Sequence, residues 1–481
     1  MHLLLGLYIV FLVLILAYNL LQLNLLRHYL DREKVKAAPP PADGDTPFVT
    51  VQLPLFNEPY VAERLIDNII ALDYPRDRFE VQILDDSTDD TTEICERKAG
   101  MYRDRGFDIR VIHRTDRTGF KAGALAEGLR QAKGEFVAIF DADFLPSPRF
   151  LRDTVPYFRD ERVGVVQTRW AHLNSDYSLF TKLQALQLNV HFTIEQMGRK
   201  AGNHFLQFNG TAGIWRKRAI EDAGGWKADT LTEDLDLSFR AQLKQWQIVY
   251  LEDIEAPAEL PAEMNGIKSQ QFRWMKGGAE NARRLAPLIM GSRLPLRTKL
   301  HALVHLANSS IFVATLMLAL SSVALLPFLD DLEVDPRALS FSLLGLVGVA
   351  AVYFYANITL LPKPVSLHQV LALVGYFPLL LIMFMGLSFH NSVAVVEGYL
   401  GIKSSFVRTP KYNIVGRIRQ RTDRDQKNPI SNILIIEGLL ALLFSAALLL
   451  AALVGNYSFF IFHLMLAIGF GIVFVVSWRD R

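Results

Sequence analysis

The sequence has only one cysteine and almost no net charge, and each of these two features excludes some classes of protein. Cys95 stands alone among 481 residues, so no disulfide can form within the chain. A chain without disulfides suits a reducing compartment, and we expect its soluble part to face the cytosol. The formal net charge is +2, because 51 basic residues nearly balance 49 acidic residues. Bulk charge therefore does not indicate a nucleic-acid partner.

The first apolar stretch, near residues 3–26, lacks the marks of a secretory signal peptide. It has neither a positively charged start nor a small-residue cleavage site. Positive charge beside a span favours the cytosolic side. We therefore expect residues 1–27 to form a retained transmembrane helix whose carboxyl end faces the cytosol. The basic residues that follow the stretch are Arg27, Arg32, Lys34 and Lys36.

Apolar residues make up 51% of the chain and are unevenly spread. Residues 28–295 have the composition of a soluble protein, whereas the last third is dominated by apolar runs. Each run is long enough to cross roughly 30 Å of hydrocarbon. The later apolar segments lie near residues 301–327, 339–361, 367–395, 431–453 and 457–477.

A basic stretch between Lys403 and Lys427 limits how these segments can cross a membrane. If all five crossed, this stretch would lie opposite the soluble domain, yet its charge favours the cytosol. We therefore expect segment 367–395 to be an interfacial or re-entrant helix that is interrupted at Pro378, Gly386 and His390. With the first helix counted, that leaves five spans in total and an external N-terminus. The expected order is a transmembrane helix at 1–27, a cytosolic domain at 28–295, transmembrane helices at 296–366, an interfacial helix and loop at 367–430, and transmembrane helices at 431–481.

The soluble part alternates short β-branched runs with helical stretches. This alternation predicts an α/β domain with a doubly wound, mostly parallel sheet. In such sheets, ligands bind beyond the carboxyl ends of the strands. The expected strands are 49–55, 80–84, 109–113, 136–140 and 163–167, and the expected helices are 58–72, 89–105 and 121–132.

Two acidic motifs fall at predicted strand ends. Asp85-Asp86 closes the second strand, and Asp141-Ala142-Asp143 closes the fourth. Two carboxylates at this spacing can reach one Mg²⁺ or Mn²⁺ ion, which would neutralise a diphosphate. Lys121, at the start of a predicted helix, could add positive charge to the same diphosphate. Acidic residues are also typical of helix N-termini and polar loops, so the motifs alone leave both interpretations open.

Further motifs in the soluble part complete a pattern. They are Leu53-Pro54-Leu55-Phe56-Asn57-Glu58, Val166-Gln167-Thr168-Arg169-Trp170, Phe208-Asn209-Gly210-Thr211-Ala212-Gly213-Ile214-Trp215-Arg216, Thr232-Glu233-Asp234-Leu235-Asp236-Leu237 and Gln270-Gln271-Phe272-Arg273-Trp274. Together they resemble the family-2 glycosyltransferases of the membrane-bound cellulose-synthase-like branch, which have a GT-A-like domain. They are particularly similar to the plant mannan and xyloglucan-backbone synthases. The resemblance covers residues 48–285, with a weaker continuation to about 412.

The resemblance implies a set of donor-binding residues. Glu58 would lie near the ribose and Asp86 near the base of a nucleotide sugar. Asp143 would bind the metal, and Asp141 would lie close to the donor sugar or nucleotide.

The resemblance also implies residues for the acceptor and the reaction. Asp234 would be the general base. Gln270 and Arg273 would line the donor site, with Arg273 on the diphosphate. Trp274 would stack under the acceptor sugar, and the Asn209-Gly210-Thr211 turn would form part of the acceptor pocket.

The reaction itself requires such groups. Displacing a nucleoside diphosphate from an anomeric carbon needs a base on the attacking hydroxyl and charge stabilisation on the leaving group. Asp234, beside Glu233, suits the first role, and a metal with Lys121 and Arg273 suits the second. One base opposite the leaving group implies inversion. Acidic residues in the first turn of a helix, or a tryptophan packed in a core, would also fit these positions of the sequence.

Two features of the membrane part suggest additional roles. The segment Phe406-Val407-Arg408-Thr409-Pro410-Lys411 resembles the gating loop of cellulose-type synthases, although Arg408 stands where valine is usual. Thr409 and Lys411 could contact the diphosphate, and a basic loop beside lipid headgroups is the alternative. Polar residues at the start of a span could line a conduit for a glycan, or could bond neighbouring helices. They are His301, His305, Asn308, Ser309 and Ser310, with Tyr353 or Tyr355 as sugar platforms.

The sequence therefore predicts an inverting glycosyltransferase in a multi-pass membrane protein of the plasma membrane. It would move a hexose, with UDP-glucose favoured and GDP-mannose possible, onto a β-linked polysaccharide that is elongated processively and exported. The alternative is a lipid glycosyltransferase that adds one sugar to diacylglycerol, ceramide or a polyprenyl acceptor. Expected partners are a nucleotide sugar, Mg²⁺ or Mn²⁺, membrane lipid, and an accessory or regulatory subunit.

Overall fold

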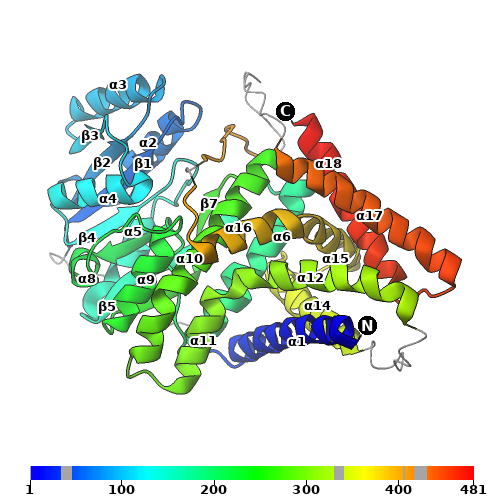
Figure 1. The fold of residues 1–481 in the computed structure, drawn as a ribbon. Coiled ribbons are helices and arrows are strands. Elements are labelled where there is room, and N and C mark those ends of the chain that lie inside the picture. Colours follow the sequence, from blue (N-terminus) through cyan, green and yellow to red (C-terminus); the bar gives the residue numbers. More distant parts are fainter. Residues whose placement is uncertain (1, 34–45, 330–340, 405–406, 417–430, 481) are drawn as a thin grey trace.

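The computed structural model describes residues 2–33, 46–329, 341–404, 407–416 and 431–480. An α/β domain lies on one side of the molecule and a group of long helices on the other (Figure 1). The first helix, α1 (His2–Leu30), runs along the helical side, so the chain enters the α/β domain from that side. Phe406 and most of the basic stretch that ends at Lys427 fall outside the described residues.

A seven-stranded sheet forms the centre of the α/β domain. Its strand order is β3-β2-β1-β4-β6-β5-β7, and every neighbouring pair is parallel except those that involve β6. This arrangement confirms the mostly parallel sheet expected from the sequence. The strands are β1 (Val49–Leu55), β2 (Phe79–Asp85), β3 (Ile109–His113), β4 (Phe136–Ile139), β5 (Val163–His172), β6 (Gly213–Arg216) and β7 (Gln247–Ala258).

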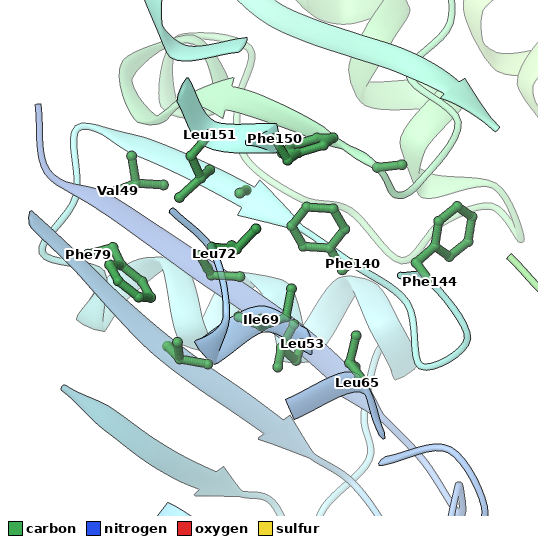
Figure 2. Packing of buried hydrophobic residues seen from close by; sticks show 14 of the residues in the cluster. Val49, Leu53, Leu65, Ile69, Leu72, Phe79, Phe140, Phe144, Phe150 and Leu151 are labelled. Carbon is green, nitrogen blue, oxygen red and sulfur yellow. The ribbon is translucent and has the colours of Figure 1, made fainter. Parts of the chain in front are cut away.

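Apolar side chains from the sheet and its helices form the core of this domain. In α2 (Ala62–Ile70), the buried residues Leu65 and Ile69 are one helical turn apart and face the sheet. Figure 2 shows them against Leu53 of β1, with Phe140 beyond the end of β4 close by. Helices α3 (Thr91–Arg103) and α4 (Phe120–Gln131) also pack on the sheet. The packed sheet holds the strand ends, and with them the acidic motifs, in fixed positions.

Two long helical segments connect the α/β domain to the apolar helices. The first comprises α6 (Leu179–Val190), a π-helical turn η3 (His191–Glu195) and α7 (Gln196–Ala201), and it packs against α1. The second, α10 (Met264–Gly291), carries Arg273 and Trp274 and packs along α16 (Ser388–Leu400). A Cβ atom at Gly398 of α16 would lie only 2.6 Å from the Lys276 carbonyl oxygen, so glycine is what permits this close approach.

Five of the described helices are long and apolar enough to cross a membrane, which is typical of a multi-pass membrane protein. They include α15 (Leu367–Gly386), which continues through Pro378 and is followed, after Leu387, by α16. The described part of the 339–361 segment forms α14 (Phe341–Thr359), whose residues Gly345–Thr359 make a shorter apolar helix. Length and composition do not decide which of these helices cross, so the expected five spans, with 339–361 crossing and 367–395 in the interface, stay a prediction. The other helices are α5 (Phe150–Thr154), α8 (Lys217–Asp222), α9 (Glu233–Leu243), α11 (Leu296–Leu306), α12 (Ile311–Leu325), α17 (Asn432–Val454) and α18 (Phe460–Arg479).

Candidate active site

A cavity of about 220 Å³ opens at the carboxyl ends of the central strands. Residues from β-strand ends, from α9 and α10, and from the segment after α16 converge on it, although they are spread over more than 350 positions of sequence. Its charged lining comprises the acidic residues Glu58, Asp86, Asp141, Asp143, Glu233, Asp234 and Glu259 and the basic residues Arg117, Lys121, Arg273, Arg408 and Lys411. The structure therefore places the acidic motifs and a set of cations around one space.

The structure brings together nearly all of the residues predicted for the site. Besides the charged residues already given, Asn209, Gly210, Gln270, Trp274 and Thr409 line the same cavity. Thr211 is the exception, because it is fully buried behind the wall rather than on it. Its hydroxyl accepts a hydrogen bond of 2.8 Å from the Asp141 backbone nitrogen. Thr211 therefore holds the acidic turn in place and does not line the cavity.

Asp234 lies at the first turn of α9, next to Glu233. Burial in the cleft and the adjacent Glu233 carboxylate raise the pKa of Asp234 to about 7. Burial also raises the pKa of Glu233, against the opposing charge of Lys121. A carboxylate with a pKa near neutrality is suited to accept a proton from a hydroxyl and release it again.

Gly210 allows the Asn209-Gly210-Thr211 turn to approach Asp234. Its φ angle is +78°, and a Cβ atom there would lie 3.0 Å from Asp234 Oδ2. Only glycine combines this left-handed backbone with such a close neighbour. The turn therefore passes close to the Asp234 carboxylate, with no room for a larger residue at this position.

Lys121 connects the Asp141-Ala142-Asp143 motif to the Asn209-Gly210-Thr211 turn. Its ammonium group is paired with Asp141 and donates a hydrogen bond of 2.9 Å to the Gly210 carbonyl oxygen. Burial opposes the charge of Lys121, but Asp141 and Glu233 outweigh it and raise the pKa of this lysine. Lys121 thus stays cationic inside the cleft, where a diphosphate would need a counter-charge.

Asp143 and Glu58 form a second acidic pair, and both are buried. Asp143 Oδ2 accepts hydrogen bonds from Lys411 Nζ at 2.8 Å and from the Glu259 backbone nitrogen at 3.1 Å. Glu58 is ion-paired with Arg408 at 2.7 Å. Burial raises the pKa of Glu58 to about 8, against the pull of Arg408 and Lys411.

The donor set at Asp143 fits a divalent cation that is shared with a phosphate. Among the described residues, no three His, Cys, Asp or Glu side chains are arranged to hold a metal by themselves. Mg²⁺ needs only one or two carboxylates when substrate phosphates and water supply the other oxygens. Asp143 meets that requirement because it is a buried carboxylate whose present partner is a lysine on a separate segment.

Asp86 lies at the far end of the cavity, between two arginines. Arg114 donates two hydrogen bonds to its carboxylate, of 2.7 and 2.6 Å, in a bidentate pair. The guanidinium of Arg117 lies 3.3 Å over the centre of the Phe56 ring. A nucleobase bound here could donate a hydrogen bond to the Asp86 carboxylate and stack on the planar group of Arg117 or Phe56. The adjacent Asp85 is fully buried and bonded to His113 and Thr92, so it supports the strand end.

The described part of the gating-like segment, residues 407–416, lies over the cavity. Arg273 donates to Thr409 Oγ1 at 2.9 Å and to the Val407 carbonyl oxygen. Glu259 accepts hydrogen bonds from the Tyr412 and Ile414 backbone nitrogens, at 2.7 and 3.0 Å. Sequence reasoning missed Glu259. Glu259 directly follows β7, at the same sheet edge as the acidic motifs, and this position could have indicated that it belongs to the site.

A second cavity, of about 380 Å³, continues from the first towards the apolar helices. Asn209, Trp274 and Asp234 line both cavities, and Trp170 does so as well. The far end is formed by side chains of α1, of η4 (Asn308–Ser310) with α12, and of α14 and α15. The two cavities therefore meet at the predicted base.

Only part of the predicted conduit lining is found in this second cavity. His305, Asn308 and Ser309 line it, as does Tyr353. His301 instead stacks on His204, with ring centroids 3.5 Å apart, and Ser310 bonds the Tyr399 hydroxyl at 2.7 Å. Tyr355 packs on Tyr29 of α1. These residues do not share one face because α11 ends at Leu306 and the 3₁₀ turn of η4 changes the helical register.

Comparisons with known proteins agree with this geometry. A family model described as "Glycosyltransferase like family 2" matches residues 46–277. Glucomannan 4-beta-mannosyltransferase 1 of Cyamopsis tetragonoloba is 33% identical over 449 residues, which cover 89% of this chain and 82% of that protein. The chain belongs to glycosyltransferase family 2. Within it, the chain groups with the cellulose-synthase-like members, as the motifs indicated.

Other relatives and one solved structure support the assignment of this glycosyltransferase. Glucomannan 4-beta-mannosyltransferase 2 of Arabidopsis thaliana is 42% identical over 252 residues, or 51% of this chain and 47% of that protein. A mannosyltransferase of Pyrobaculum calidifontis, solved with GDP-Man and Mn²⁺, shares the fold. Its TM-score is 0.52 at 22% identity, over 78% of this chain and 97% of that one. The protein is thus a nucleotide-sugar-dependent hexosyltransferase with a GT-A-like domain.

Proposed function

We propose that this glycosyltransferase moves mannose from GDP-mannose onto the end of a β-linked mannan-type polysaccharide. The names of the curated relatives support a mannosyl donor, and none of these relatives supports the UDP-glucose preference expected from the sequence. The observation that carries the proposal is the position of Asp234, whose carboxylate lies where the two cavities meet. One cavity suits a nucleotide sugar, and the other leads away from it.

The donor would lie in the first cavity with its base near Asp86 and its diphosphate near the cations. When bound through Asp143, Mg²⁺ or Mn²⁺ would supply positive charge to the leaving diphosphate. Lys121 and Arg273 would neutralise the remaining charge, because both guanidinium and ammonium groups line the same space. Burial lowers the pKa of Arg273 to about 10, so its guanidinium remains charged at neutral pH.

The acceptor hydroxyl would approach from the second cavity and give its proton to Asp234. Attack from this side, opposite the leaving diphosphate, forms the new bond as the old one breaks and inverts the anomeric carbon. Glu233 would tune the base rather than replace it, because its carboxylate raises the pKa of Asp234. Trp274 and Trp170, which line both cavities, would support the acceptor ring by stacking.

The lining of the second cavity favours a glycan over an acyl chain as the acceptor. Buried polar atoms that have no hydrogen-bond partner within the described residues occur along it, among them Oδ1 of Asn19, Oε1 of Gln22 and Oδ1 of Asn308. A sugar chain can bond such groups, whereas an acyl chain would leave them unsatisfied. Because the cavity runs among helices long enough to cross a membrane, we propose that elongation is processive and that the product is exported along it.

The gating-like segment would close over the bound donor and exclude water, which otherwise competes as an acceptor. Thr409 and Lys411 would then contact the diphosphate. Their present partners are Arg273 and Asp143, both of which are donor-site residues. The lid therefore rests on the groups that the donor would engage, and donor binding would exchange one set of contacts for the other.

Membranes that contain the enzyme, incubated with radiolabelled donors, test the proposal. GDP-mannose is expected to give a ladder or an insoluble polymer that β-mannanase degrades, and UDP-glucose is expected to give less product. A single labelled spot in the lipid extract would instead support transfer to a lipid. Comparable incorporation from UDP-glucose, or none from GDP-mannose, would contradict the proposed donor.

A further inference from the structure

Three charged or titratable residues of the α6–η3–α7 segment form a buried group beside the second cavity. His191, Glu195 and Arg199 follow one another at four-residue intervals across the π-helical turn. The side chain of Glu195 is 9% exposed and that of Arg199 is 6% exposed. The proposed roles of the donor residues and of Asp234 make no use of this group.

The Glu195 carboxylate is fixed by hydrogen bonds on both oxygens. Gln22 of α1 donates to Oε1 at 2.8 Å, and His191 Nδ1 and Arg199 Nη2 lie 2.9 and 3.3 Å from Oε2. Burial opposes its charge, but Arg199 and His191 hold the pKa of Glu195 well below its usual range. Glu195 is therefore an ionised acceptor with a fixed orientation, and it orients the imidazole that bonds to it.

The other nitrogen of the His191 ring points towards the reaction centre. His191 Nε2 lies 3.0 Å from Asn209 Oδ1. Since an amide oxygen can only accept, this nitrogen donates and fixes which way the Asn209 amide faces. The amide nitrogen of Asn209 makes only a long contact of 3.5 Å with the Gln207 carbonyl oxygen, so it keeps donor capacity.

Asn209 lies in the same part of the site as the predicted base, because both residues line both cavities. Its backbone nitrogen donates to Gln167 Oε1 at 2.9 Å, which anchors the residue to β5. The following residue, Gly210, is the one whose backbone passes close to Asp234. Asn209 lines both cavities, as Asp234 does, and His191 lines the second. A sugar hydroxyl bound by the Asn209 amide would thus lie beside the carboxylate that deprotonates it.

The π-helical turn gives a second, independent reason to assign a role to this group. The segment forms five residues of π-helix between two α-helices, where an uninterrupted α-helix is the ordinary outcome. Such turns are rare and are concentrated at functional sites, because they displace side chains from regular helical positions. Here the turn contains both His191 and Glu195.

We propose that Glu195 and His191 form a positioning pair that holds the Asn209 amide towards the acceptor sugar. The pair acts through Asn209 and does not touch the reacting atoms. This inference rests on the proposed function, because it assumes a glycan acceptor in the second cavity. A simple anchor for α1 would require only the Gln22 to Glu195 hydrogen bond, and it would leave the bond from His191 to Asn209 without a purpose.

Purified full-length enzyme, with GDP-mannose and a soluble β-manno-oligosaccharide as acceptor, tests the pair. His191→Leu is expected to raise the acceptor KM roughly tenfold, as expected for one lost hydrogen bond in the binding site, while GDP affinity by calorimetry stays within twofold. His191→Gln is expected to recover part of the loss, since its amide nitrogen can take the place of Nε2. The double variant with Asn209→Ala should lose no more than Asn209→Ala alone, because both changes remove the same contact.

Tyr29→Phe is the matched control for an anchoring role. Tyr29 of α1 donates a hydrogen bond of 2.6 Å to Glu252 of β7, so this change loosens α1 without touching the second cavity. It should lower the melting temperature and leave the acceptor KM unchanged. Equal effects of Tyr29→Phe and His191→Leu on KM would overturn the proposal.

The outcomes separate the inference from the proposed function. If the wild-type enzyme transfers no mannose to any manno-oligosaccharide, the proposed function fails. If it does so but the His191→Leu enzyme keeps its acceptor KM within twofold, the positioning role fails and the function stands. Should His191→Leu not fold, Glu195→Gln gives the same test, because it keeps the shape of Glu195 and removes its charge. An unchanged acceptor KM in Glu195→Gln also overturns the positioning role.

Discussion

Lys411 Nζ lies 2.8 Å from Asp143 Oδ2, so a lysine of the lid pairs with the carboxylate proposed to bind the metal. Burial opposes the charge of Lys411, but Asp143 outweighs it and raises the pKa of this lysine. An ammonium group thus holds the place that a divalent cation would take. We therefore expect the lid and a divalent cation to compete for this carboxylate.

Replacing Lys411 by alanine should change metal binding and turnover in opposite directions. Without the ammonium group, Asp143 is free to bind Mn²⁺, so the affinity of the nucleotide-free enzyme for Mn²⁺ should rise. Turnover should fall, because the closed lid loses a cation on the diphosphate. Electron paramagnetic resonance of Mn²⁺ and release of labelled nucleotide measure the two effects. Lys403→Ala, an exposed lysine of the same region, is the control, and identical behaviour of the two variants would contradict the prediction.

Asp234→Asn should abolish transfer and retain nucleotide binding. Asparagine keeps the size of the side chain but cannot accept the hydroxyl proton, so we expect a loss of roughly 10²–10⁴-fold in turnover. Transfer from labelled GDP-mannose and calorimetry with GDP measure the two properties. Full activity of this variant would remove Asp234 from the role of base.

The rate should depend on pH through Asp234. Burial and Glu233 raise the pKa of Asp234 to about 7, and only its ionised form accepts a proton. Below pH 7, kcat/KM should therefore fall about tenfold per pH unit. Glu233→Gln removes the neighbouring charge, so the acidic limb should move to lower pH. A limb that stays in place in this variant would show that another group controls it.

Gly210→Ala should impair catalysis more than it impairs folding. The residue has φ +78°, and the added Cβ atom would lie 3.0 Å from Asp234 Oδ2. Gly225, with φ +72° and no atom within 4 Å of such a Cβ, isolates the backbone effect. Both alanine variants should lose roughly 1–2 kcal/mol of stability from the left-handed backbone. Only Gly210→Ala should lose transfer activity, as measured with labelled donor, and equal activity losses would argue against the contact.

Much of the α/β domain could be predicted, because its strands are buried on both faces and read as β-branched runs. The structure confirms the five expected strands to within a few residues, and with them the sheet edge that gathers Asp86, Asp143 and their neighbours. Strands β6 and β7 were not predicted. Strand β6 has only four residues, which is too short for a clear pattern. Strand β7 contains acidic residues and Pro257 and pairs irregularly with β5, so its sequence does not alternate as a regular strand does.

The pairing of charges could not be predicted, because it depends on tertiary contacts between distant segments. Arg408 stands where valine was expected, and in the structure it forms an ion pair with Glu58, which is 350 positions earlier in the sequence. Helix α15 was expected to break at Pro378, yet it continues through that residue. A proline interrupts only one backbone hydrogen bond, and packing against α18 supplies the remaining support.

Arg273 and Trp274 are consecutive residues of α10, and they serve opposite ends of the site. Arg273 carries the hydrogen bonds that hold the lid, whereas Trp274 stands in the wall shared by both cavities. A product that advances by one sugar past Trp274 would press on the same helical turn that anchors the lid. Movement of this one helical turn would then couple elongation of the product to reopening of the lid. No separate signal would be needed before the next donor binds.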